Sequence, residues 1–318
     1  MIRAGFVGHL REAGHFKAMK HPRPKQIGIG LGLRRENIDA LLAERPTNVD
    51  CLEIAPENFM GTGGKNYRKF RELAELYPML VHGLTLSVGS LKPLDRGFLK
   101  KLKLFLKEIR APWMTDHLCY ASVQGKQFHD LLPLPLTQEA LRHVVKRIRQ
   151  VQDFLELPFA VENVSYYAPA GAGEMPEWEF LSEVVERAGS SLLFDVNNVY
   201  VNSVNHRFDP MEYLRHVPLN RVIHVHIAGH TPMKDFLLDT HGAEIIHPVW
   251  KLFEYVAKQI EIPGVIIERD HNVPALAEQV KEVEIARRIV RQGQALAAAR
   301  RKVSTKKHDA KEKRVMAQ

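Results

Sequence analysis

Eight short apolar segments, separated by amphipathic stretches of helical length, constrain the fold of this 318-residue chain most strongly. Apolar residues recur with a helical period between them, as in TQEALRHVVKRIRQVQDFLEL. Strands that alternate with helices form parallel βαβ units, and eight such units can close into a barrel. We therefore predict the α/β class and a single (β/α)8 TIM barrel, with a doubly wound open sheet as the alternative. The predicted strands lie near residues 27–31, 50–54, 79–84, 112–117, 158–163, 191–196, 221–228 and 264–269.

The charge divides the chain into unequal regions. The net charge is +8, but the tail 287–318 holds 11 Lys and Arg against 2 Asp and Glu, and the rest holds 34 against 35. We predict an N-terminal arm at 1–26, the barrel at 27–286, and a basic tail at 287–318 that is disordered or folds only on a partner. The nearly neutral charge of residues 1–286 argues against a nucleic-acid partner.

The cellular compartment is predicted from three further features. The chain has two cysteines, Cys51 and Cys119, which is too few for a disulfide framework and fits a reducing compartment. No apolar run reaches the roughly 18 residues that span a bilayer. The first 20 residues lack the apolar core of a secretion signal. We expect a cytoplasmic protein with no membrane contact.

Side chains that bind metals stand at the carboxyl ends of the predicted strands or in the loops after them. Buried carboxylates and imidazoles cost several kcal/mol each unless they are paired or coordinated. The carboxyl ends of barrel strands converge on one mouth, so these residues can meet there. Nitrogen and oxygen ligands without a thiolate suit iron, manganese or zinc. The candidates for a site of two or three cations are His82, His117, Glu162, Asp195, His226, Asp239, His241 and Glu268.

Each candidate also has a simpler interpretation. A single histidine at a strand end is more often structural, and Asp195 or Glu162 alone would fit a helix N-cap or an ion pair. Their joint occurrence favours the metal site. His224 and His226 alternate on one strand and face the same way, so the choice between them stays open. Four further residues could orient a metal ligand instead of binding the metal themselves. They are His224, His230, Asp116 and Asp270. Histidines without a predicted metal role are His9, His15, His21, His143, His206, His216 and His247.

Other segments bear on the predicted mouth. Three long connections, 118–136, 165–178 and 197–213, follow strand ends, where the loops of such barrels build active sites. In EIAPENF, Glu53 is a candidate ligand, base, or partner of Arg34. Cys119 is expected to be a small buried residue.

The motifs EIAPENF, VHGLTLSVG, TDHLCY, FAVENVSYY, FDVNNVYVN, VHIAGH, DTHG and IIERD together resemble the multinuclear non-heme iron-dependent oxidative enzymes. The resemblance covers about residues 27–275 and leaves the basic tail outside. It implies a xylose-isomerase-like barrel with two or three iron ions, in mixed Fe(II) and Fe(III) states, at its mouth. By motif, the eight candidates above resemble the iron ligands. Glu162 would bridge, and Glu162 and Asp195 would serve catalysis. His226 is favoured over His224 because it precedes the Ile-Ala-Gly-His turn.

The resemblance also implies a reaction. Such enzymes use dioxygen to modify cysteine in a ribosomally synthesised precursor peptide, usually with a recognition-partner protein that binds the peptide leader. We expect the substrate thiolate to bind iron and hydrogen to be removed from the cysteine β-carbon, with Tyr166, Tyr167 and Tyr200 lining the peptide path. One alternative is a metal-dependent hydrolase or isomerase on the same barrel, of endonuclease or sugar-isomerase type. The other is a non-catalytic metal-binding protein.

Overall fold

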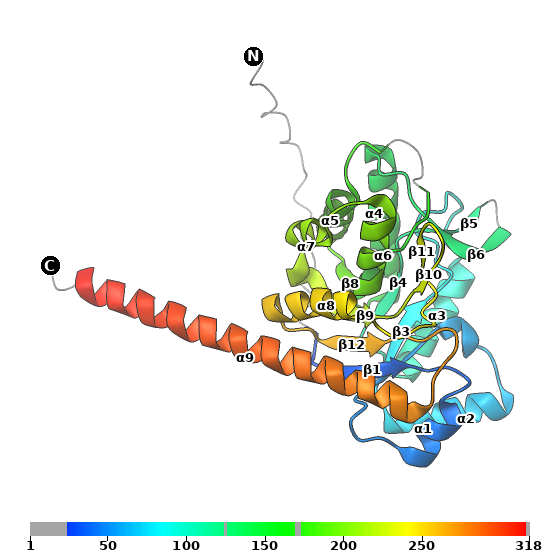
Figure 1. The fold of residues 1–318 in the computed structure, drawn as a ribbon. Coiled ribbons are helices and arrows are strands. Elements are labelled where there is room, and N and C mark those ends of the chain that lie inside the picture. Colours follow the sequence, from blue (N-terminus) through cyan, green and yellow to red (C-terminus); the bar gives the residue numbers. More distant parts are fainter. Residues whose placement is uncertain (1–23, 124–125, 169–172, 316–318) are drawn as a thin grey trace.

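The computed structural model describes residues 24–123, 126–168 and 173–315, with the backbone alone for 122–123, 126–130 and 297–315 (Figure 1). Eight parallel strands close into a barrel, which confirms the predicted (β/α)8 fold and rules out the open sheet. In spatial order the strands are β1 (Gly28–Gly32), β12 (Gly264–Ile267), β9 (Val222–Ile227), β8 (Ser191–Asp195), β7 (Phe159–Glu162), β4 (Met114–His117), β3 (Met79–Gly83) and β2 (Leu52–Ile54).

Helices cover the outside of the barrel wall (Figure 1). The longest in the middle of the chain is α4 (Gln138–Leu155), whose first turn is capped by Thr137, because its hydroxyl accepts from the Ala140 amide at 3.2 Å. Its buried face is the apolar stripe predicted from the sequence. The other helices of the wall are α1 (Ile38–Glu44), α2 (Gly64–Leu76), α3 (Arg96–Glu108), α5 (Glu177–Ala188), α6 (Val196–His206), α7 (Pro210–His216) and α8 (His247–Gln259).

The barrel interior has an apolar floor with a polar layer above it. The floor is one buried cluster made of Cys51, Leu80, Trp113, Ala160, Leu193, Ile223 and Ile266. Successive side chains of a strand point to opposite faces, so the residue two positions further along points into the barrel again. For six of the seven floor residues, those positions hold Glu53, His82, Thr115, Glu162, Asp195 and Glu268, all of them buried; the position two after Ile223 holds Val225. The strand period therefore places a layer of polar side chains at the carboxyl ends of the strands, which form the mouth of the barrel.

Two of the long connections contain regular structure. Residues 118–136 include the antiparallel hairpin of β5 (Tyr120–Val123) and β6 (Lys126–Leu132). Residues 197–213, expected to be a loop, belong to α6 and to α7 as far as Tyr213, apart from the short link between them. Val and Asn are weak helix formers, which is why the sequence suggested a loop. Burial of Val196, Val199 and Val201 outweighs that weak preference.

The C-terminal helix α9 (Leu276–Val315) runs through the expected tail boundary at residue 287. The expectation was a tail that is disordered or folds only on a partner, and the structure has helical backbone there up to Val315. The segment lacks proline and is rich in Ala, Lys, Arg and Gln, which are good helix formers. The segment continues the first part of α9, which packs on α8. The two helices approach closely at Gly293, where a β-carbon would lie 2.3 Å from the Ala257 carbonyl oxygen.

Parts of the expected N-terminal arm and C-terminal tail lie outside the residues that the structure describes. The expected arm at 1–26 lies outside them up to residue 23, and the tail does so after Val315. Among the helices that the structure describes, none combines the length and the apolar character that crossing a membrane requires.

Candidate metal centre

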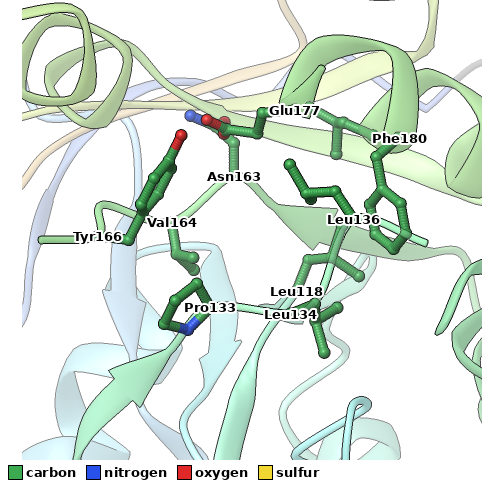
Figure 2. A pocket seen from close by; sticks show the side chains of 10 residues that line it. Leu118, Pro133, Leu134, Leu136, Asn163, Val164, Tyr166, Glu177 and Phe180 are labelled. Carbon is green, nitrogen blue, oxygen red and sulfur yellow. The ribbon is translucent and has the colours of Figure 1, made fainter. Parts of the chain in front are cut away.

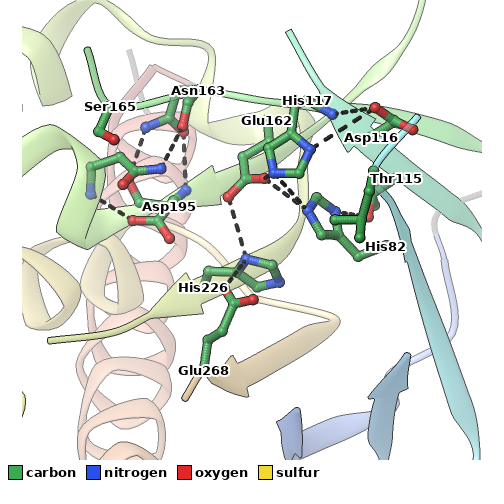
Figure 3. Close-up of polar contacts among 12 residues, drawn as sticks. His82, Thr115, Asp116, His117, Glu162, Asn163, Ser165, Asp195, His226 and Glu268 are labelled. Atoms are coloured by element: carbon green, nitrogen blue, oxygen red, sulfur yellow. Dashed lines mark hydrogen bonds and ion pairs between the residues drawn. The ribbon is translucent and has the colours of Figure 1, made fainter. Parts of the chain in front are cut away.

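Four groups of possible metal ligands lie in the described part of the barrel. Three of them are joined by shared carboxylates at its mouth, and Figure 3 shows the first two of these three. The fourth, made of Glu53, His224 and His226, shares only His226 with them. Within each group, one ligand atom from every residue lies within 4.8 Å of the others. Glu162 belongs to the first and second groups, and Asp195 to the second and third, so carboxylates connect the three. These three groups are His82, His117 and Glu162; Glu162, Asp195 and His226; and Asp195, His241 and Glu268.

The first group is held by a hydrogen bond that fixes a histidine tautomer. His82 Nε2 lies 3.1 Å from Glu162 Oε2 and 3.1 Å from His117 Nε2. On the other side of the ring, His82 Nδ1 lies 2.8 Å from Thr115 Oγ1, which itself donates to the Val81 carbonyl at 3.2 Å. Because the threonine proton is already used, Thr115 accepts the Nδ1 proton of His82. Nε2 is therefore the ring nitrogen of His82 that faces His117 and Glu162 and is left for a metal ion.

The second group centres on His226, whose Nδ1 lies 3.3 Å from Glu162 Oε1 and 3.0 Å from Glu268 Oε2. Register brings its members together, because Asp195 on β8 is paired with His226 on β9. His117 on β4 is likewise paired with Glu162 on β7. The polar layer is thus set by strand pairing as well as by strand period.

Asp195 has two structural roles at once. It is the N-cap of α6, where Oδ1 accepts from the Asn198 amide at 2.6 Å. The side chain of Asn163 fixes its backbone by donating to the Asp195 carbonyl at 2.9 Å and accepting from the Asp195 amide at 3.0 Å. Its second oxygen, Oδ2, is buried without a hydrogen-bond partner. The helix cap and the metal candidate are therefore different oxygens of one carboxyl group.

The third group includes a histidine held between carboxylates. His241 Nε2 lies 2.8 Å from Asp239 Oδ1, and its Nδ1 lies 3.0 Å from Asp270 Oδ2. Arg34 pairs with Asp270 and, at 3.1 Å, with Glu268. Asp270 thus orients His241, the positioning role that the sequence left open for it. Arg34 pairs with these two acids, whereas a contact with Arg34 is one of the three candidate roles of Glu53.

Asp239 lies beside the third group without belonging to any of the three. Its Oδ2 accepts from the Ser165 hydroxyl at 2.9 Å and its Oδ1 from the Asn197 amide at 2.8 Å. His230 Nδ1 lies 2.7 Å from Asn197 Oδ1, so His230 reaches Asp239 only through Asn197. The Tyr167 hydroxyl accepts from the Asp239 amide at 3.0 Å.

Buried atoms without hydrogen-bond partners gather at this mouth. A buried polar atom left unpaired costs about 1–3 kcal/mol, so such a concentration calls for a physical reason. The atoms are Asp195 Oδ2 and His117 Nδ1, together with Glu162 Oε2, His226 Nδ1 and His241 Nε2, which lie 2.8–3.1 Å from an ion-pair partner but lack hydrogen-bond geometry. All are oxygen or nitrogen donors of the kind that borderline metal ions take. The residues present therefore fit a group of bound cations.

The mouth carries more acid than base. Burial lowers the pKa of His82, but the Glu162 carboxylate outweighs it and raises that pKa to about 9. Burial, and then the neighbouring His82, lower the pKa of His117 to about 4. Burial raises the pKa of Asp195 well above its ordinary value. Among the described residues, Arg34 is the one Lys or Arg in contact with these acids. Cations would supply the positive charge that the surrounding acids need.

Sequence reasoning missed Thr115 and Trp113, which stand two and four residues before His117. The strand period was the available signal, because all three side chains share one face of β4. Cys119 is buried beside Ala121 and Val164, as expected. Asp116 accepts from the amides of Leu86 and His117 and is not in any of the three groups.

The histidines predicted to lack a metal role do not enter the three groups where the structure describes them. His143 contacts the Ser90 carbonyl, His206 the Tyr166 carbonyl, and His216 the Glu212 carbonyl. His247 lies at the start of α8 and is exposed. His9, His15 and His21 lie outside the described residues.

A largely apolar pocket lies beside the centre (Figure 2). Two of its lining residues, Leu118 and Asn163, directly follow the metal candidates His117 and Glu162. Its one carboxyl group is Glu177, which accepts from the Tyr213 hydroxyl at 2.8 Å. Burial raises the pKa of Glu177 to about 7. The other lining residues are Pro133, Leu134, Leu136, Val164, Tyr166, Phe180 and Leu181.

Comparison with known protein families gives a match over almost the whole barrel. The model of a family described as RiPP precursor modification enzyme MbnB/TglH/ChrH matches residues 28–291. A UPF0276 protein of Shewanella loihica is 47% identical over 259 residues, which cover 81% of this chain and 92% of the relative. A UPF0276 protein of Nitrosospira multiformis is 41% identical over 261 residues, covering 82% and 92%.

Solved structures share the fold at low sequence identity. L-ribulose 3-epimerase superposes with a TM-score of 0.56 at 14% identity, covering 88% of this chain and 97% of that one. Endonuclease IV from Thermus thermophilus gives a TM-score of 0.50 at 16% identity, covering 84% and 99%. These similarities support the xylose-isomerase-like barrel and nothing about the reaction.

Proposed function

Because the chain belongs to the family of RiPP precursor modification enzymes described as MbnB/TglH/ChrH, we propose that it uses iron and dioxygen to modify cysteine residues of a ribosomally synthesised precursor peptide. The observation that carries the proposal is the set of three adjoining groups joined by Glu162 and Asp195. Shared carboxylates suit several cations held close together better than one isolated ion. A centre of several redox-active ions matches an oxidative modification of a peptide.

The proposed centre contains two or three iron ions in mixed Fe(II) and Fe(III) states. Bound iron would supply the redox chemistry with dioxygen, and the protein supplies geometry and the exclusion of water. We assign Glu162 and Asp195 the catalytic roles because each stands between two groups. The full proposed ligand set is His82, His117, Glu162, Asp195, His226, Asp239, His241 and Glu268. Seven of these belong to the three groups, and Asp239 lies 2.8 Å from His241.

The chain's own residues would bind and orient the peptide. The segments on either side of hairpin β5–β6, at Leu118 and at Pro133, and the segment after β7 line the apolar pocket, so we propose that the hairpin region and the segment after β7 hold the peptide near the metals. Tyr166 lines the pocket, and Tyr167 is 49% exposed beside Asp239. Tyr200 packs against His230, with ring centroids 5.3 Å apart. A recognition-partner protein for the peptide leader and a cytoplasmic location remain part of this proposal.

A metal-dependent hydrolase or isomerase is the main competing function, since epimerases and an endonuclease share the barrel. A nuclease needs Lys and Arg around its mouth to meet phosphates. Here Arg34 is paired with Glu268 and Asp270, and acids dominate the mouth. The surroundings of the centre therefore disfavour a polyanionic substrate.

The experiment that tests the proposal supplies purified, anaerobically iron-loaded protein with a cysteine-containing precursor peptide encoded near its gene. Oxygen consumption and the mass of the peptide are followed together. The proposal expects oxygen uptake that depends on the peptide, with a mass change located on cysteine. Turnover of a sugar or a phosphodiester with zinc or manganese, independent of oxygen, would favour the hydrolase or isomerase. Iron binding without any peptide-dependent oxygen uptake would favour a non-catalytic metal-binding protein.

A further inference from the structure

A chain of hydrogen-bonding side chains runs from the apolar floor of the barrel up to His226. It starts at Trp113 and passes through His224 and Glu53; the Trp113–His224 and Glu53–His226 links are hydrogen bonds, and the His224–Glu53 link is an ion-pair contact at 3.3 Å. All four residues are buried, with at most 2% of any of them exposed. Glu53, His224 and His226 are also close enough to surround an ion, since one ligand atom of each lies within 4.8 Å of the others. The positions of the protons on these rings decide whether Glu53, His224 and His226 form a further metal site or whether Glu53 and His224 support His226 as a ligand.

The first proton is on Trp113. An indole N–H can only donate a hydrogen bond, and the acceptor of Trp113 Nε1 is His224 Nδ1 at 3.4 Å. The indole is held in place, because the same ring packs against Gly264, where a β-carbon would lie 2.9 Å from Trp113 Cζ2. His224 Nδ1 is therefore the unprotonated nitrogen of a neutral imidazole, and Nε2 carries the proton. A nitrogen that carries a proton has no lone pair for a metal ion.

The second proton is on His226. Glu53 lies 3.0 Å from His226 Nε2 and 3.3 Å from His224 Nε2. A carboxylate only accepts hydrogen bonds, so His226 Nε2 donates to it. The His224 Nε2–H is turned away from ideal hydrogen-bond geometry, but Glu53 is the carboxylate within salt-bridge distance of it. Glu162 and Glu268 face the other ring nitrogen, Nδ1. With the Nε2 proton held by Glu53, Nδ1 is the nitrogen that would exchange its proton for a metal ion.

We propose that Glu53, supported by His224 and Trp113, is a positioning residue that fixes the tautomer and ring orientation of the metal ligand His226. Glu53 and His224 then do not hold a further ion. A carboxylate that accepts from the distal nitrogen of a ligating histidine is a known way to orient the ligand and raise its basicity. The open choice between His224 and His226 is resolved in the same way, with His226 as the ligand and His224 as its indirect support.

The inference depends on the metal centre of the proposed function, but not on iron, dioxygen or a peptide. The test therefore titrates the metal-free full-length protein with Mn²⁺ and counts bound ions at saturation. For Glu53→Ala we expect the saturating number of ions to equal that of the wild type, with an affinity about 10- to 100-fold weaker for one of them. Glu53→Gln keeps an oxygen acceptor for His226 and should recover part of that affinity. Loss of one ion per chain at saturation in both variants would overturn the proposal in favour of a further metal site.

Trp113→Phe removes the indole N–H and keeps an aromatic ring in the floor. We expect a weaker shift of affinity in the same direction as Glu53→Ala, with an unchanged ion count. The matched control is Trp250→Phe on α8, away from the barrel interior, which should leave both quantities unchanged. Equal effects of the two tryptophan variants would contradict a specific role for Trp113.

A second measurement keeps the proposal testable if a variant fails to fold. Nitrogen-15 NMR of histidine-labelled, zinc-loaded wild-type protein reports which ring nitrogen carries a proton. We expect His224 to be protonated at Nε2 and unprotonated at Nδ1, and the reverse pattern would refute the inference. If the wild type binds no metal, the proposed function fails as a whole. If it binds metal and only the Glu53 variants lose an ion, this inference alone fails.

Discussion

Glu162 Oε1 lies 3.3 Å from His226 Nδ1 in the mouth of the barrel. The two residues come from β7 and β9, with β8 between them. The other carboxylate oxygen of Glu162 faces His82 at 3.1 Å. One carboxyl group therefore reaches both the first and the second metal group, which is the geometry a bridging ligand needs.

Replacing Glu162 by alanine should remove both groups that share it. We expect Glu162→Ala to bind fewer iron ions and to form no product, because only the third group keeps its full set of ligands. Metal analysis after anaerobic loading, together with the peptide mass assay, checks this. Glu183→Ala, on the outer surface of α5, is the control and should match the wild type. Full iron occupancy and activity in Glu162→Ala would remove the bridging assignment.

The two roles of Asp195 can be separated by mutation. Asparagine caps a helix about as well as aspartate, whereas alanine costs about 1 kcal/mol at an N-cap. We expect Asp195→Asn to keep the thermal stability of the metal-free protein and to lose metal, and Asp195→Ala to lose both. Calorimetry with metal titration measures the two effects, and normal metal binding by Asp195→Asn would argue against its role as a ligand.

Thr115 is expected to act on the metal through His82. In Thr115→Val the Nδ1 proton of His82 loses its acceptor, at a cost of about 1–3 kcal/mol in stability. The ring is then less well oriented, and we expect metal affinity to fall about 10- to 100-fold. Thr115→Ser keeps the hydroxyl and serves as the matched control. Metal titration of the two variants decides the point, since equal affinities would mean that the hydroxyl does not position His82.

The sequence predicted the barrel because eight apolar strands alternate with amphipathic helices, and both signals are local. It also predicted that His82, Glu162, Asp195 and Glu268 would share the mouth, since strand period and parallel pairing place them there. It could not predict which atoms meet. The tautomer of His82 depends on Thr115. The partners of Arg34 are Glu268 and Asp270, which lie more than 200 residues further along the chain. Both arrangements are set by tertiary packing. The helix α6 was missed for the same reason, because burial outweighs its weak local preference.

Glu177 gives a pH dependence that does not involve the metal centre. Burial raises its pKa to about 7 in the folded protein, above the ordinary 4.5. An acid whose pKa is raised by folding is protonated more readily in the folded state than in the unfolded state. The contribution of Glu177 to the free energy of unfolding is therefore highest below about pH 4.5 and falls as the pH rises towards 7. We expect this fall in the wild type relative to Glu177→Gln, which cannot titrate. Urea unfolding of both proteins between pH 4.5 and 8 measures the difference, and parallel curves would show that Glu177 is not perturbed.

The apolar pocket should affect substrate binding more than the chemical step. Leu136 is half-buried in its wall, so Leu136→Trp would fill part of the space. We expect KM for the precursor peptide to rise by about tenfold or more, the usual effect of a misfit in an apolar pocket, with kcat little changed. Leu91→Trp is a control at a leucine that is 82% exposed. Unchanged KM in a folded Leu136→Trp protein would separate the pocket from the peptide path.

The arrangement of the metals can be observed directly by anomalous diffraction at the iron absorption edge, on crystals of the full-length protein grown and loaded without oxygen. The account predicts two or three neighbouring iron peaks at the barrel mouth, with Glu162 between the first and second positions and Asp195 between the second and third. A single peak, or peaks away from these carboxylates, would contradict it.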